Sequence, residues 1–200
     1  KLYNYLKTGY IQGNCSIYND IYTLESGSIL EYDVIQNKIK INEYWNPENV
    51  YLKDKINIST YDVESELDER LQKAFNYRMV SDVPVGIFLS GGIDSNILCA
   101  MLNKKHCFKT FTLGFEDADY DESIVAKETS KYLNIENINL NCSYSDFHDN
   151  FDIMYDYFDE PFGDSSAPLT MMLSNLASQY VKVSLSADGG DEFFGGYKKY

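Results

Sequence analysis

Basic residues and long apolar runs are scarce in this sequence, and each shortage excludes a class of function. The chain has 17 lysines and arginines against 31 aspartates and glutamates, which gives a net charge of -14. So acidic a chain is unsuited to bind nucleic acid or an anionic membrane surface. No apolar run reaches the ~18 residues of a transmembrane helix, and the N-terminal KLYNYLKTGY lacks the apolar core of a signal peptide.

Cysteine and histidine are also too few and too dispersed to form a metal-ligand pattern. The cysteines are Cys15, Cys99, Cys107 and Cys142, with no CxxC pair among them, which argues against a zinc site. Cys99 and Cys107 lie in apolar surroundings, and we expect both to be core thiols. This cysteine usage is typical of the reducing cytoplasm.

The most informative stretch is SDVPVGIFLSGGIDSNILC, residues 81–99. Its apolar run 85–89 predicts a strand buried on both faces, as in a parallel sheet. Ser90-Gly91-Gly92 follows as a tight turn, and Asp94 and Ser95 open a helix. A glycine turn between a strand and a helix N-terminus directs backbone N–H groups at one point, which predicts an anion site.

The loop lacks the lysine of a Walker motif and the spacing of a dinucleotide-binding turn. It contains an acid instead, Asp94. An acid beside a phosphate-binding turn is useful when a divalent metal bridges the two. The alternative is an ordinary strand-to-helix turn in which Asp94 and Ser95 are helix caps.

Strand and helix patterns alternate along most of the chain. We expect strands at 85–89, 108–114, 135–140 and 181–186, and helices at 61–80, 121–133, 147–158 and 169–179. This alternation predicts an α/β fold with a parallel sheet and helices on both faces. Ligands of such folds bind outside the carboxyl ends of the strands, where the loops after Leu89 and Leu185 lie.

The second chemical stretch, SADGGDE at 186–192, also follows a predicted buried strand. We expect Asp191 to approach Asp94 across the strand ends. The two carboxylates would repel each other unless a cation lay between them, so together they predict a divalent metal such as Mg²⁺ held on bound phosphate. The alternative is a glycine turn with solvated acids.

These two stretches resemble a known family. SGGIDS is similar to the pyrophosphate-binding loop of the N-type ATP pyrophosphatases, and SDVPVGIFLSGGIDS resembles the synthetase domain of glutamine-dependent asparagine synthetases. That resemblance implies an adenine nucleotide α-hydrolase-like (PP-loop) fold. SADGGDEFFGGY resembles the family pattern SG[DE]G[GSA]DE[LVF]FGGY, but Ala187 replaces the usual glycine. If position 187 needs a positive φ, the methyl group would weaken nucleotide binding by ~1 kcal/mol through strain.

The resemblance also implies roles for individual residues. Those that would embrace pyrophosphate are Ser90, Gly91, Gly92, Asp94 and Ser95. Asp94 and Asp191 would bind Mg²⁺. The residues that would border adenosine are Phe88, Leu113, Ser186 and Ala187. Asp188 corresponds to an acid important for forming the acyl-adenylate. The segments YDES (120–123) and DEPFGDSS (159–166) match family segments near the active site, as substrate contacts or as structural caps.

Residues 1–45 do not follow this alternation of strands and helices. They predict the end of a helix at 1–8 and short strands at 28–32 and 38–43. This region resembles the β-rich tail of an N-terminal-nucleophile glutaminase domain, although a generic β-hairpin fits equally well. Residues 46–60 would be a linker, and 61–200 the first part of the synthetase domain. The chain has no N-terminal cysteine, so we expect no glutamine hydrolysis. The family's domain continues past Tyr200, so we expect this fragment alone to be inactive.

The reaction that the resemblance implies uses ATP, aspartate, and ammonia derived from glutamine. The aspartate side chain would be adenylated to β-aspartyl-AMP with release of pyrophosphate, and ammonia would then displace AMP to give asparagine. An alternative is a relative that adenylates another carboxylate, such as a β-lactam-type synthetase or an amidotransferase acting on a sugar acid of surface polysaccharide. A non-catalytic binding module is a third reading. A homodimer is a candidate assembly for the full-length protein.

Overall fold

The computed structural model describes residues 1–55, 57–115 and 121–197. The chain divides into two compact units. The first comprises Lys1–Ile58 with Tyr155–Asp164, and the second comprises Ser59–Met154 with Ser165–Tyr200. Each unit is described by itself.

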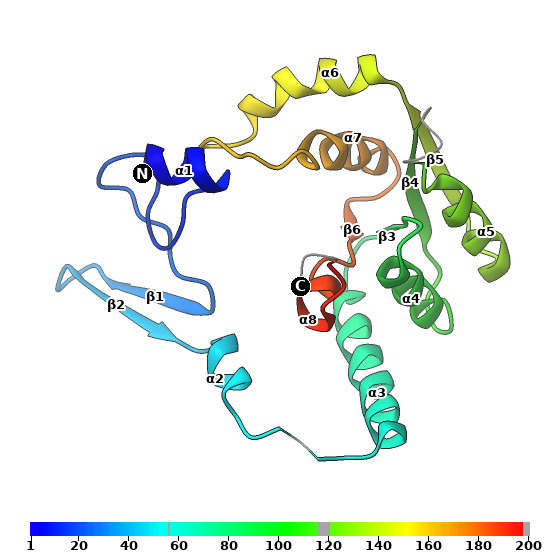
Figure 1. Ribbon diagram of the computed structural model, residues 1–200, viewed down its shortest axis with the longest axis horizontal. Helices are drawn as coiled ribbons and strands as arrows, with labels where there is room; N and C mark the ends of the chain where they lie inside the picture. Colours follow the sequence, from blue (N-terminus) through cyan, green and yellow to red (C-terminus); the bar gives the residue numbers. More distant parts are fainter. Residues whose placement is uncertain (56, 116–120, 198–200) are drawn as a thin grey trace. The chain divides into compact units, whose positions relative to one another are not determined.

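The second unit is built on a four-stranded sheet with the order β5-β4-β3-β6, in which all neighbouring strands are parallel (Figure 1). Its strands are β3 (Val85–Phe88), β4 (Lys109–Phe115), β5 (Asn137–Cys142) and β6 (Val183–Leu185). Ile87 is paired with Thr110 of β4 on one side and with Leu185 of β6 on the other. The sequence prediction of a parallel sheet is confirmed.

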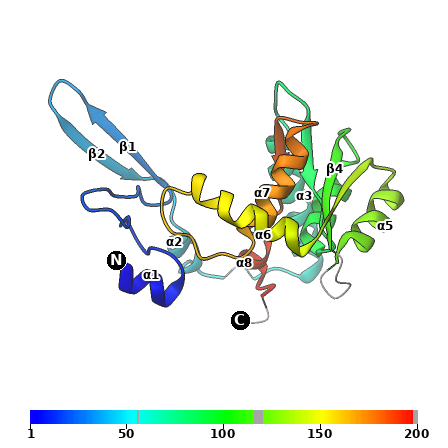
Figure 2. The same ribbon diagram turned by 90° about the horizontal axis from the view of Figure 1, so that it is seen from above.

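Helices cover both faces of this sheet. The helices of this unit are α3 (Thr60–Arg78), α4 (Ile93–Leu102), α5 (Ser123–Leu133), α6 (Tyr144–Ile153), α7 (Ala167–Ser178) and α8 (Gly190–Phe194), of which α3 packs on α4 and α6 on α7. On one face Ile87 and Leu89 pack with apolar residues of α4 and α5. On the other face Phe111 packs with residues of α7, which lies along the sheet in both views (Figure 2). A continuous apolar run such as 85–89 is what a strand covered on both sides requires.

The first unit contains α1 (Leu2–Thr8), a β-hairpin and α2 (Pro47–Tyr51). The hairpin pairs β1 (Ser28–Asp33) with β2 (Lys38–Glu43) in antiparallel register, as the sequence predicted. The stretch expected as a linker contains α2, which begins at Pro47 because Asn46 accepts a hydrogen bond from the N–H of Glu48. Proline at the first position of a helix removes only an N–H that has no partner in the helix.

One sequence prediction about the core was wrong. Cys99 is fully buried, and burial raises the pKa of its thiol to about 12, but Cys107 is exposed. Cys107 lies between α4 and β4, where its neighbour Phe108 takes the position against the core. Cys142 is the second buried cysteine.

In the parts of the chain that the structure describes, no helix combines the length and apolar character needed to cross a membrane.

Candidate active site

The two stretches singled out in the sequence follow adjacent strands. β3 and β6 are hydrogen-bonded neighbours and run parallel, so the loops after Leu89 and Leu185 leave the same edge of the sheet. The end of β3 is held on its other side as well. The N–H of Leu89 donates to the carbonyl of Phe111 (2.9 Å), and the buried hydroxyl of Thr112 donates to the carbonyl of Leu89 (2.8 Å). The loop at 90–92 therefore starts from a fixed position.

The hydroxyl of Ser95, in the first turn of α4, holds the loop at 90–92 through hydrogen bonds to Ser90. Ser95 is buried, and its Oγ accepts the N–H of Ser90 (3.1 Å) and lies 2.9 Å from the hydroxyl of Ser90. The hydroxyl of Ser90 accepts in turn the N–H of Gly92 (3.1 Å). The N–H groups of Ser90 and Gly92 are thus already hydrogen-bonded to the hydroxyls of Ser95 and Ser90. Gly92 is the N-cap of α4 and has no side-chain cap, so the first-turn N–H groups of α4 are the donors suited to an anion.

Asp94, in the first turn of α4, lies directly against Gly190, which follows the loop after β6. A β-carbon built on Gly190 would overlap the Asp94 carboxylate, with Cγ of Asp94 at 2.5 Å. Only a glycine at position 190 lets the backbone approach the Asp94 carboxylate this closely. The preceding Gly189 has a φ of 98°, which also favours glycine. The carboxylate of Asp191, one residue further on, lies against Gly196, whose N–H donates to the Asp191 carbonyl (3.0 Å).

The residues predicted to border adenosine lie around the same strand ends. Phe88 and Leu113 are half-buried, and Ser186 is exposed. Ala187 packs its methyl group against the cluster that contains Ile87 and Leu89. Its φ is not positive, so the strain considered for this position does not arise. Asp188 is exposed.

The sequence analysis placed Glu122 only within the YDES segment, as a substrate contact or a structural cap, and the structure brings it to the loop. Its carboxylate accepts the N–H of Gly91 (3.1 Å), although 31 positions separate the two. The adjoining Asp121 fixes this turn by accepting N–H groups from Phe115 (3.3 Å) and Ser123 (3.0 Å). Hydrogen bonds from Ser123 hold the pKa of Asp121 below its usual range. The YDES motif was the only sequence signal, and its Tyr120 lies outside the described residues.

The second matched segment, at 159–166, lies mostly in the first unit, where Glu160 has structural partners. Its carboxylate accepts the hydroxyl of Ser16 (3.1 Å) and the N–H of Ile17 (2.8 Å). The N–H of Gly163 donates to the carbonyl of Gly9 (2.9 Å). These contacts tie residues 159–163 to the N-terminal segment.

The acids at the strand ends suit a metal that is shared with phosphate. Within residues 1–55, 57–115 and 121–197, no three histidine, cysteine or acidic side chains gather as a metal site. Mg²⁺ on a nucleotide needs fewer protein ligands, because one or two carboxylates, the phosphate oxygens and several waters together fill its octahedral shell. The half-buried Asp94, at the start of α4 and against Gly190, fits that donor set.

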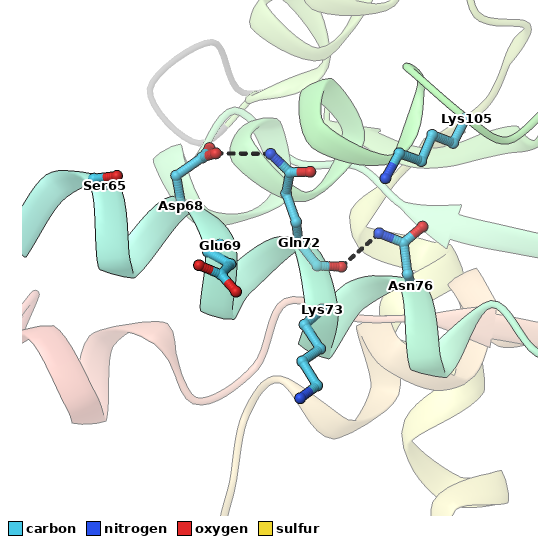
Figure 3. A pocket seen from close by; sticks show the side chains of 7 residues that line it. All are labelled: Ser65, Asp68, Glu69, Gln72, Lys73, Asn76 and Lys105. Atoms are coloured by element: carbon cyan, nitrogen blue, oxygen red, sulfur yellow. Dashed lines mark hydrogen bonds between the residues drawn. The ribbon is translucent and has the colours of Figure 1, made fainter.

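A separate surface pocket lies along α3 (Figure 3). Its side chains are polar or charged and belong to Ser65, Asp68, Glu69, Gln72, Lys73, Asn76 and Lys105. Several of them bond to one another along the helix, as Gln72 does to Asp68 (2.7 Å). None belongs to the loops at the strand ends, so this pocket is a solvated helix face.

Comparison of the sequence with known proteins shows which family the chain belongs to. The sequence model of the protein family described as asparagine synthase matches residues 66–200. This range includes the whole sheet and the loops after β3 and β6. The chain belongs to the asparagine synthase family. A putative glutamine-hydrolysing asparagine synthetase 2 of Methanocaldococcus jannaschii is 36% identical over 96% of this chain. The glutamine-hydrolysing asparagine synthetase 1 of Bacillus subtilis is 40% identical over 68% of it.

This asparagine synthase-family chain spans only part of these relatives, 37% of the first and 22% of the second. Among solved structures, it aligns with a glutamine-dependent NAD+ synthetase from Acinetobacter baumannii in complex with ADP. The TM-score is 0.48 at 18% identity, covering 84% of this chain and 31% of that chain, which is too distant to support an argument about function.

Proposed function

We propose that this chain supplies the ATP-binding part of a ligase that adenylates the side-chain carboxylate of aspartate and lets ammonia convert it to asparagine. The observation that carries the proposal is the meeting of Asp94 and Gly190 across the ends of β3 and β6. It joins, at one edge of the sheet, the two motifs that the family match spans.

In the proposed reaction, a carboxylate oxygen of aspartate attacks the α-phosphorus of ATP, and the bond to pyrophosphate breaks. Ammonia then attacks the acyl carbon, loses a proton and displaces AMP. The N–H groups at the start of α4, which lack a side-chain cap, would stabilise the negative charge that develops on pyrophosphate. Asp94 and Asp191 would hold Mg²⁺, which neutralises phosphate charge when bound.

The remaining assignments follow the same proposal. Phe88, Leu113, Ser186 and Ala187 would border adenosine, and the exposed Asp188 would act near the acyl-adenylate. Residues 1–45 would be the tail of a glutaminase domain that supplies ammonia, with 46–60 as a linker to the synthetase part.

The test is pyrophosphate release by the full-length protein with MgATP, ammonium and a panel of carboxylic acids. We expect release with aspartate and formation of asparagine. Release only with another acid, such as a sugar acid, would replace aspartate as the substrate. Asp94→Asn and Asp191→Asn should each weaken MgATP binding. If neither variant changes MgATP affinity, the shared metal site is wrong.

A further inference from the structure

Glu122 places a negative charge on the loop that the proposed function reserves for pyrophosphate. Its carboxylate oxygen Oε2 accepts the N–H of Gly91 at 3.1 Å. The N–H groups of Ser90 and Gly92 already have acceptors close by in the sequence, the hydroxyls of Ser95, in the first turn of α4, and of Ser90. The Gly91 amide is therefore the loop N–H whose acceptor comes from a distant part of the sequence, at the start of α5.

The backbone around Glu122 holds this contact close. A β-carbon on Gly91 would lie 3.1 Å from Cβ of Glu122 and 3.3 Å from Cβ of Val125, so the start of α5 packs directly on the loop. Asp121 keeps the turn before α5 in place through its bonds to Phe115 and Ser123. The base of the Glu122 side chain is thus fixed by the fold.

The end of the Glu122 side chain has solvent beside it into which it can turn, because the residue is exposed. A phosphate oxygen that took the Gly91 N–H would lie beside the carboxylate, and two anions on one donor repel each other. A glutamate can swing its carboxylate into water at little cost, whereas its Cβ remains against the loop.

We propose that Glu122 is a positioning residue whose carboxylate competes with pyrophosphate for the Gly91 amide and so promotes release of this product. The inference rests on the proposed function, since it assumes that pyrophosphate forms on this loop. After the bond to the α-phosphorus breaks, the carboxylate would return to the amide and reduce the affinity for the leaving anion.

The test is the affinity of Mg-pyrophosphate for the wild-type chain, Glu122→Gln and Glu128→Gln, measured by calorimetry. Glutamine keeps the size and an oxygen acceptor but removes the charge. Glu128→Gln makes the same charge change on the exposed side of α5, about 9 Å further along the helix axis at 1.5 Å per residue. We expect Glu122→Gln to bind about fivefold more tightly, the factor for the ~1 kcal/mol by which a hydrogen bond to a charged acceptor exceeds one to a neutral acceptor, and Glu128→Gln to match wild type.

A merely structural role of Glu122 would lower the affinity or leave it unchanged, and either result overturns the inference. Glu122→Ala should also bind more tightly than wild type, which guards against an effect specific to glutamine. If the wild type binds neither Mg-pyrophosphate nor MgATP, the proposed function itself fails. If it binds both and Glu122→Gln brings no gain, only the inference about Glu122 fails.

Discussion

A β-carbon at position 190 would overlap the carboxylate of Asp94, and this gives Gly190→Ala a predictable effect. The φ of Gly190 is not positive, so alanine adds no backbone strain there. Alanine is also favoured over glycine by about 1 kcal/mol in a helix interior and by less at the first position of α8, which offsets part of the clash. The carboxylate must move, since Cγ of Asp94 would lie 2.5 Å from the new methyl group. We therefore expect a change of no more than ~1 kcal/mol in the free energy of unfolding.

The effect on nucleotide binding should be much larger. A displaced Asp94 loses a charge-assisted interaction of about 1.5 to 3 kcal/mol, which corresponds to a roughly 10- to 100-fold higher Kd for MgATP. Gly189→Ala is the matched control, because its φ of 98° makes alanine strained while a β-carbon there would only touch the Phe193 ring at 3.9 Å and would not reach Asp94. That variant should lose about 1 to 2 kcal/mol of folding stability.

Calorimetric titration of MgATP and urea unfolding measure the two effects separately. The decisive comparison adds Gly190→Ala to an Asp94→Ala background, where the carboxylate no longer exists and the second substitution should change nothing more. The reasoning is refuted if Gly190→Ala leaves the Kd of MgATP unchanged, or if it weakens binding equally in both backgrounds.

Three further outcomes can be checked. Ser95→Ala should lower the free energy of unfolding by about 1 kcal/mol in urea titration, because the N–H of Ser90 loses its acceptor, the buried hydroxyl of Ser95. An unchanged midpoint would contradict the hydroxyl network. The lowered pKa of Asp121 stabilises the fold above the ordinary value of 3.8, and this contribution disappears as pH falls through the lowered pKa. Asp121→Asn should therefore show a smaller loss of Tm between pH 5 and pH 2, the window about the ordinary carboxyl pKa, than wild type. In the native protein a thiol reagent should label Cys107 rapidly and Cys99 only on unfolding, which mass spectrometry after digestion would show; early labelling of Cys99 would contradict its burial.

Most of the elements could be predicted from the sequence because their signals are local. The run 85–89 became β3 (Val85–Phe88), and the predicted helix at 61–80 became α3 (Thr60–Arg78). The amphipathic stretch 147–158 was less well predicted. α6 starts earlier, at Tyr144, because Ser143 and Asp146 form a capping box, and it ends at Ile153.

Burial in short connections was harder to predict. Cys107 and Phe108 are adjacent and both apolar, so no periodicity distinguishes the exposed residue from the packed one. The contact between Glu122 and Gly91 had no spacing signal at all, because it joins the start of one helix to the loop before another.

The amino-acid sequence by itself determined the alternation of strands and helices, the glycine turns and the acids within them, since each depends on backbone preferences and periodicity over a few neighbouring residues. The tertiary structure decided which of these parts meet. Pairing of β3 with β6, nearly a hundred positions apart in the chain, brought Gly190 to Asp94. Packing of α5 against the loop brought Glu122 to Gly91. Such pairings arise from the packing of a whole core and from strand order, which no local window of the sequence contains.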